Sequence, residues 1–229
     1  MTPDKPRVPE AILFDLDGTL VDSAPDLGYA ANLVRESLGL APLPPADYRP
    51  QASNGARGLL KVALNIAMDH PDYEARKALF LKFYEANLTT HSRLFEGVVE
   101  MLAALDDAGL PWGIVTNKAG WLAQPVVEQL GFAANCRTLV AGDSTPHPKP
   151  APDGLLLAAR RIGVDPGACV YVGDDIRDVV AGRAAGMRTV AAGWGYLGTE
   201  PDVEKWKADH VAATPSDLVW LLNLARAAR

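Results

Sequence analysis

The chain has 229 residues, a formal net charge of −6 and a pI of about 5.2. A mildly acidic protein has no general attraction for nucleic acid or anionic membranes, and a hydrophobic fraction of 48% excludes a disordered chain. The length suits one main domain with a smaller inserted one.

Targeting and redox signals are weak in this sequence. The first ten residues carry prolines and charges without an apolar signal core, and no apolar run is long enough to span a membrane. Two cysteines, Cys136 and Cys169, form no C-x-x-C pair, and Cys169 opens an apolar run typical of a core position. We therefore expect a soluble cytoplasmic protein that binds neither nucleic acid nor membranes. Its oligomeric state is not indicated.

The first predicted element is a strand, AILFDLD at residues 11–17. An apolar run without polar alternation is typical of a strand covered on both faces. This run leads directly into Asp15 and Asp17, which would repel each other and lose hydration there. Two carboxylates at the end of a buried strand therefore need a chemical reason.

The next 70 residues show no convincing strand. Helical patterns cover residues 25–39, 55–70 and 73–88, with a proline-rich break at 41–50. We predict a small α-helical cap domain at residues 23–94, inserted into a core domain made of residues 1–22 and 95–229. The hinges should lie near residues 20–24 and 92–97.

Strands and helices alternate in the rest of the chain. Further strands are predicted at residues 112–117, 138–142, 169–174, 188–193 and, more weakly, 210–213. The helical patterns between them stop at Gly109, Gly131, Gly163 and Gly186, glycine being the usual left-handed residue after a helix. A last helix begins after Thr214, with Asp217 placed for a capping box. This alternation predicts an α/β fold, a Rossmann-like parallel sheet with helices on both faces.

Polar side chains follow four of these strands at their carboxyl ends, where ligands bind in open parallel sheets. They are Asp15 and Asp17, Thr116 and Asn117, Lys149, and the group Asp174, Asp175 and Asp178. Each alone has an ordinary explanation, such as a helix cap or a solvated loop lysine. Their convergence from four separate stretches predicts a functional site.

The residue types at this site suggest a metal and a phosphate. Clustered carboxylates need a positive partner, and oxygen ligands without a His or Cys cluster favour Mg²⁺ over zinc. Magnesium binds phosphate oxygens, and Thr116 and Lys149 would add a hydroxyl donor and a fixed charge. Gly18 would let the loop after Asp15 approach the ligand closely.

The motifs DLDGT (15–19), TN (116–117), KP (149–150) and GDDIRD (173–178) together resemble the haloacid dehalogenase-like superfamily. The helical insertion is similar to the cap of its phosphoglycolate phosphatase branch. The resemblance implies a central parallel sheet with the nucleophile strand in the middle. It also implies a magnesium-dependent phosphomonoester hydrolase that acts on a small phosphorylated metabolite.

The resemblance gives each matching residue a role. Asp15 would be the nucleophile and a metal ligand, and Asp17 the general acid and base with its backbone carbonyl on magnesium. Asp174 would complete the metal ligands. Phosphate-binding and supporting roles would fall to Thr116, Asn117, Lys149 and Asp178. Asp15 would form an aspartyl-phosphate, and Asp17 would protonate the leaving group and then activate water.

The sequence supports two candidate substrates about equally. The general motifs fit phosphoglycolate, whereas HSRLFEG, WGIVTNK, GDDIRD and AAGWGY also resemble N-acetylmuramic acid 6-phosphate phosphatases. In the cap, Arg57 is a candidate partner for a substrate carboxylate, the alternative being a solvent-facing arginine at a helix start. Lys118 has a phosphate-binding and a solvent-facing alternative. The segment WGYLG (194–198) has a pocket-wall alternative and, for Trp194, a core-packing one, and His147 near Lys149 is expected to be a loop residue.

Three other functions stay open. A phosphosugar mutase would use the same motifs but return the phosphoryl group to a sugar. A phosphonate-cleaving enzyme would need a cap lysine that forms a Schiff base, and Lys61 is the candidate. A non-catalytic phosphometabolite-binding protein is the last alternative, and the intact set of catalytic residues disfavours it.

Overall fold

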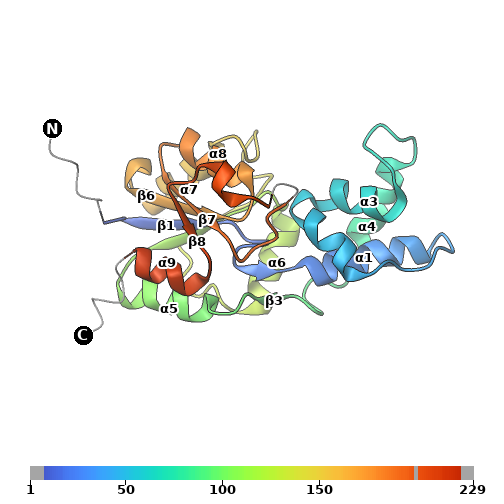
Figure 1. Cartoon of the computed structure of the whole chain (residues 1–229), viewed down its shortest axis with the longest axis horizontal. Helices are drawn as coiled ribbons and strands as arrows, with labels where there is room; N and C mark the ends of the chain where they lie inside the picture. The colour runs from blue at the N-terminus through green and yellow to red at the C-terminus, as the bar shows by residue number, and fades with distance from the viewer. Residues whose placement is uncertain (1–7, 199–200, 223–229) are drawn as a thin grey trace.

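The computed structural model describes residues 8–198 and 201–222, and a parallel sheet forms the centre of these residues (Figure 1). Its strands are β1 (Ala11–Phe14), β4 (Trp112–Val115), β5 (Leu139–Val140), β6 (Cys169–Gly173), β7 (Arg188–Ala192) and β8 (His210–Ala212). Their order is β5-β4-β1-β6-β7-β8, and every neighbouring pair is parallel. The predicted strands and the central position of β1 are confirmed.

Helices cover both faces of the sheet, as expected for an α/β fold. Alternate residues of β1 point to opposite faces. Ile12 and Phe14 pack in the cluster with α5 (Val98–Asp107), α6 (Gly120–Leu130) and α9 (Pro215–Leu221). Ala11 and Leu13 pack with α7 (Asp153–Ile162) and α8 (Ile176–Ala184). Both faces of β1 are therefore buried, which explains its unbroken apolar run. Short 3-10 turns, η2 (Pro166–Ala168) and η3 (Val203–Trp206), complete this part.

A helical unit, residues 24–85, lies to one side of the sheet (Figure 1). It consists of α1 (Ala24–Glu36), α2 (Pro45–Tyr48), η1 (Arg49–Asn54), α3 (Gly55–Leu64) and α4 (Tyr73–Glu85). Helix α1 packs against both α3 and α4. The large buried aromatic side chains Tyr48, Phe80 and Tyr84 form much of its interior.

Two connections join the helical unit to the sheet. They pair as short antiparallel strands, β2 (Val21–Asp22) and β3 (Arg93–Leu94), at the positions where we expected hinges. The sequence predicted neither of these short strands. Just beyond this pair, the buried carboxylate of Asp26 accepts hydrogen bonds from the backbone N–H groups of His91 and Ser92, at 3.0 and 2.7 Å. The two chain segments are thus fastened to each other, while the hinge motion and the domain boundaries stay predictions.

One helix end differs from the predictions. Helix α3 ends at Leu64 rather than near residue 70, because Asn65 adopts a left-handed conformation with φ 55°. Helix α6 begins at Gly120 and includes Pro125, and it ends before Gly131 as predicted. The capping box of Thr214 and Asp217 is confirmed, and residues 223–229 of the predicted last helix lie outside the described residues. Within the described chain, no helix has the length and apolar character needed to cross a bilayer.

Candidate active site

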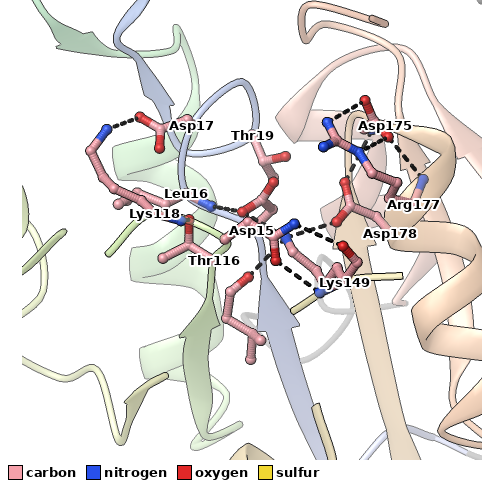
Figure 2. A network of polar contacts seen from close by, with 12 residues as sticks. Asp15, Leu16, Asp17, Thr19, Thr116, Lys118, Lys149, Asp175, Arg177 and Asp178 are labelled. Atoms are coloured by element: carbon pink, nitrogen blue, oxygen red, sulfur yellow. Dashed lines mark hydrogen bonds and ion pairs between the residues drawn. The ribbon is translucent and has the colours of Figure 1, made fainter. Parts of the chain in front are cut away.

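Strand ends and the helical unit enclose a cavity of about 360 Å³. The predicted residues that line it are Asp15, Asp17, Thr116, Asn117, Lys118, Lys149, Asp175 and Asp178. Asp174 is absent from the lining and is fully buried. Figure 2 shows that the side chains of Asp15, Lys149 and Asp178 come from separate segments and point toward one another. The predicted convergence at the carboxyl edge of the sheet is present.

Lys149 is the central cation of the site. Its Nζ atom lies 2.8 Å from Oδ1 of Asp15 and 2.8 Å from Oδ1 of Asp178. It also donates to the hydroxyl of Tyr171 at 2.8 Å and to the carbonyl of Val115 at 3.1 Å. Burial alone would lower the pKa of Lys149, but the two carboxylates outweigh it, so the pKa is raised. Lys149 is therefore a fixed positive charge between β1 and β6.

The side chain of Asn117 holds Lys149 in place through the backbone. Its Nδ2 atom donates to the carbonyl of Lys149, and the backbone N–H of Lys149 donates to Oδ1 of Asn117, both at 2.9 Å. Thr116 is buried, and its hydroxyl oxygen accepts from the N–H of Lys118 at 3.1 Å. Asn117 thus acts here on the position of Lys149, while its predicted contact with phosphate stays a prediction.

Two carboxylates of the site are held in an unfavourable environment for a negative charge. Burial raises the pKa of Asp15 to about 7; Lys149 opposes this shift, and Asp178 and Asp17 add to it. Burial, together with Asp15 and Asp178, raises the pKa of Asp174 well above its usual range. Asp174 has only two neutral donors, the hydroxyl of Thr19 at 3.2 Å and the N–H of Tyr196 at 2.9 Å, among its contacts in the described chain.

A divalent cation fits these carboxylates. One oxygen from each of Asp15, Asp174 and Asp178 lies within 4.8 Å of the other two. An all-oxygen donor set suits Mg²⁺, and a dication would relieve the repulsion that raises the pKa values of Asp15 and Asp174. The side-chain cluster contains Asp178 in addition to the predicted pair. The predicted ligand from Asp17 is its backbone carbonyl, and that contact stays a prediction.

Asp17 is connected to the helical unit through Lys118. Its Oδ1 atom accepts from Nζ of Lys118 at 2.7 Å and from the hydroxyl of Ser23 at 2.5 Å. The same Nζ donates to the hydroxyl of Tyr84 on α4 at 2.7 Å. Burial works against the charge on Lys118, but Asp17 and Tyr84 outweigh it and its pKa is raised. Lys118 is therefore a buried cation of the site rather than a solvent-facing residue.

Arg177 makes a second connection to the helical unit. Its guanidinium group binds both oxygens of Asp175, at 2.7 and 2.9 Å, and donates to the backbone carbonyl of Ser53 at 2.8 Å. Figure 2 shows this pair beside Asp178. Burial opposes the charge on Asp175, but Arg177 outweighs it, so the pKa of Asp175 is lowered. Arg177 thereby connects the first turn of α8 to Ser53 in the helical unit.

Two glycines bring backbone against Asp174. A Cβ atom on Gly18, which has φ 88°, would lie 2.2 Å from Oδ2 of Asp174, so only glycine fits this turn. A Cβ atom on Gly195 would lie 2.2 Å from Cβ of Asp174. Trp194 beside it donates from Nε1 to the carbonyl of Thr19 at 2.8 Å. The segment after β7 therefore packs against Asp174 of the carboxylate cluster rather than lining the cavity.

Several predicted residues lie elsewhere. Arg57 is exposed, contacts Asn54 and is not in the cavity lining. Lys61 is exposed and donates to Asn65 at 2.7 Å, so it is not placed for Schiff-base chemistry at this cavity. His147 is exposed and lies 2.9 Å from Asp153.

Other residues contribute to the site without having been assigned a role from the sequence. Tyr171, Tyr196, Arg177 and Trp121 are the main ones. Tyr171 lies in an apolar strand that reads as core, and Tyr196 and Trp121 act across large sequence separations. Arg177 carried a usable signal, since it lies within GDDIRD between two site carboxylates.

Comparison with known proteins gives a consistent result. The family model of the haloacid dehalogenase-like hydrolases matches residues 9–186. A phosphoglycolate phosphatase of Xanthomonas campestris pv. campestris is 49% identical over 93% of this chain and 96% of its own length. An N-acetylmuramic acid 6-phosphate phosphatase of Pseudomonas aeruginosa is 39% identical over 94% of this chain and 96% of its own. The crystal structure of a predicted phosphoglycolate phosphatase from Haemophilus somnus has a TM-score of 0.84 at 28% identity and covers 95% of this chain and 99% of that one.

Proposed function

The chain belongs to the haloacid dehalogenase-like hydrolases, and from that premise we propose that it is a magnesium-dependent phosphomonoester hydrolase acting on a small phosphorylated metabolite. The observation that carries the proposal is the position of Asp15. Its carboxylate lies at the cavity wall, 2.8 Å from the ammonium group of Lys149, and clusters with the buried carboxylates Asp174 and Asp178. This arrangement suits a nucleophile that must approach an anionic phosphorus atom.

Asp15 presents one oxygen for attack. The N–H of Leu16 and the ammonium group of Lys149 both bind Oδ1, at 2.7 and 2.8 Å, so the other oxygen is left for the phosphorus atom. Attack forms a P–O bond to Asp15 and breaks the bond to the leaving oxygen. A bound Mg²⁺ supplies positive charge that offsets the repulsion between the carboxylate and the phosphoryl oxygens. Lys149 and Thr116 hold the transferring group.

Asp17 moves the protons. It gives a proton to the leaving oxygen and later takes one from the water that attacks the aspartyl-phosphate. That second attack releases phosphate and restores the Asp15 carboxylate. Asp17 lines the cavity beside Lys118, within reach of a leaving group held against the helical unit. We propose that this unit is a cap that excludes water during the reaction. Arg57 would need movement of the cap to reach a substrate carboxylate.

The substrate proposal follows the relatives. The relatives from Xanthomonas campestris pv. campestris and Pseudomonas aeruginosa, which align over 96% of their own length, are named phosphoglycolate phosphatase and N-acetylmuramic acid 6-phosphate phosphatase, respectively. Both named substrates are phosphomonoesters that bear a carboxylate. The test is phosphate release from a panel containing both compounds, with Mg²⁺ and with a chelator. We expect turnover only with the metal, and its loss in Asp15→Asn.

The same assay separates the other candidates. Phosphate release without an acceptor sugar counts against a mutase. Binding without turnover of any phosphomonoester would instead support the non-catalytic protein and overturn the proposal.

A further inference from the structure

One wall of the cavity is apolar and takes no part in phosphoryl transfer. Helix α4 contributes Phe80, Leu81 and Tyr84, which share one helix face at spacings of three and four residues. Helix α6, which covers the sheet and does not belong to the helical unit, contributes Trp121 and Leu122. Trp121 lines the cavity and is 47% exposed, so much of its ring surface is open for a ligand to cover.

The phosphoryl group cannot be what this wall contacts. Asp15, Thr116 and Lys149 already provide polar partners for its oxygens, and an anionic group gains nothing from apolar surface. The wall must therefore meet the leaving group. A two-carbon acid offers almost no apolar area to cover it. The cavity of about 360 Å³ falls within the roughly 300–1,000 Å³ of clefts that bury drug-sized ligands.

The lining also contains polar groups suited to a hydroxylated ligand. The hydroxyl oxygen of Ser53 is buried and has no hydrogen-bond partner among the described residues, although Ser53 lies in the cavity wall. Lys77 on α4 lies in the same wall, and its only ion pair in the described chain is a 3.4 Å contact with the exposed Glu74. An acidic substituent on the ligand would pair with Lys77, whereas a ligand hydroxyl would reach the Ser53 oxygen only after that side chain rotates toward the cavity.

From these observations, and resting on the proposed function, we propose that the leaving group is amphipathic and of sugar size, and that Trp121 is a specificity residue that packs against its apolar face. A sugar ring presents C–H groups on one face and hydroxyls at its edge, which matches an aromatic wall with a few polar groups. Among the two substrate candidates this favours the phosphorylated amino sugar acid over phosphoglycolate.

The test is a comparison of kcat/KM for phosphoglycolate, a hexose 6-phosphate and N-acetylmuramic acid 6-phosphate. The variants are Trp121→Ala and Trp121→Phe, and the control is Trp220→Ala, because Trp220 is 68% exposed on α9 outside the cavity lining. We expect wild-type protein to prefer the sugar phosphates. In Trp121→Ala the decrease in kcat/KM for the sugar phosphates should exceed the decrease for phosphoglycolate by about tenfold or more, mainly through a higher KM. Trp121→Phe should retain most of the wild-type kcat/KM for the sugar phosphates.

A binding measurement keeps the result independent of turnover. In the Asp15→Asn background, N-acetylmuramic acid 6-phosphate should change tryptophan fluorescence, and Trp121→Phe should remove most of that change. Equal losses on small and large substrates, or a wild-type preference for phosphoglycolate, would overturn the inference. Failure to hydrolyse any phosphomonoester would instead overturn the proposed function.

Discussion

The ammonium group of Lys118, just after β4, lies 2.7 Å from the hydroxyl of Tyr84 on α4 in the helical unit. The same ammonium group lies 2.7 Å from Asp17, the proposed general acid. One buried cation thus joins a proton-transferring carboxylate to the part of the chain that we propose to close over the substrate. Closure and the orientation of Asp17 should therefore depend on each other.

Removing the Tyr84 hydroxyl tests this dependence. In Tyr84→Phe, Lys118 loses one partner, and we expect kcat to fall about fivefold, corresponding to one hydrogen bond of about 1 kcal/mol. Tm should change little, because the ring stays in the core. The control is Tyr73→Phe, at a buried position on the same helix. If the kcat of Tyr84→Phe equals that of the control, the function of Asp17 does not depend on the contact between Lys118 and Tyr84.

Magnesium affinity should depend on pH below neutrality. In the metal-free protein the pKa of Asp15 is raised to about 7, mainly by burial, so below that pH a cation must displace a proton. The proton on Asp15 alone should make the affinity fall by about tenfold per pH unit as pH decreases below 7, and a proton on Asp174, whose pKa is also raised by burial, would add to that fall. Calorimetric Mg²⁺ titrations at pH 6, 7 and 8 in two buffers of different ionisation enthalpy measure both affinity and released protons. Constant affinity from pH 6 to 8 would contradict this account.

Sequence patterns were sufficient for the sheet and for the residues at its edge. Strand β1 could be identified because both of its faces are buried, which leaves an unbroken apolar run before Asp15. The carboxyl ends of parallel strands meet at one edge, so Asp15, Thr116 and Asp174 could be brought together without coordinates. The apolar run and the shared carboxyl edge of parallel strands are together enough to predict these positions.

The same patterns could not supply the contacts between distant segments. Tyr171 lies in a strand of core residues, yet its hydroxyl binds Lys149. Trp121 and Phe80 line one cavity although they come from different helices. Arg57 is a predicted partner for a substrate carboxylate, but it is exposed on α3 and absent from the cavity lining. Such positions depend on how helices pack, which no local spacing determines.

Lys149 should matter for stability as well as for catalysis. Lys149→Met leaves Asp15 and Asp178 without their buried cation, and breaking such a pair typically costs about 3–5 kcal/mol. We expect this loss in urea unfolding of the metal-free protein. The double variant Lys149→Met/Asp178→Asn should recover part of it, because one of the unpaired charges is gone. No recovery would mean that the tyrosine and carbonyl contacts of Lys149 determine its contribution.

Asp26 should hold the two connections of the helical unit together. Its fully buried carboxylate accepts from the N–H groups of His91 and Ser92 and from the Ser92 hydroxyl at 2.6 Å. Asp26→Asn replaces one acceptor oxygen with a donor, and we expect a loss of about 2–3 kcal/mol in the free energy of unfolding. Amide exchange at His91 and Ser92 should accelerate. Ser92→Ala removes the hydroxyl contacts with Asp26 and with the carbonyl of Leu88 but leaves both N–H donors to Asp26 in place, so it should have a smaller effect on both measurements.

Gly195 provides the most direct test that backbone packing sets the metal site. A Cβ atom there would lie 2.2 Å from Cβ of Asp174 and 2.4 Å from the carbonyl oxygen of Gly18, so Gly195→Ala must displace one of them. Moving a residue that supports a metal ligand typically lowers metal affinity about 10–100-fold, and we expect a loss of that size in Mg²⁺ titrations, with a parallel fall in kcat at limiting metal. The control is Gly167→Ala, an exposed position where the nearest atom to the new Cβ is 3.1 Å away. If excess Mg²⁺ restores full turnover, the displacement weakens metal binding alone; unchanged affinity would show that Asp174 does not bind the metal.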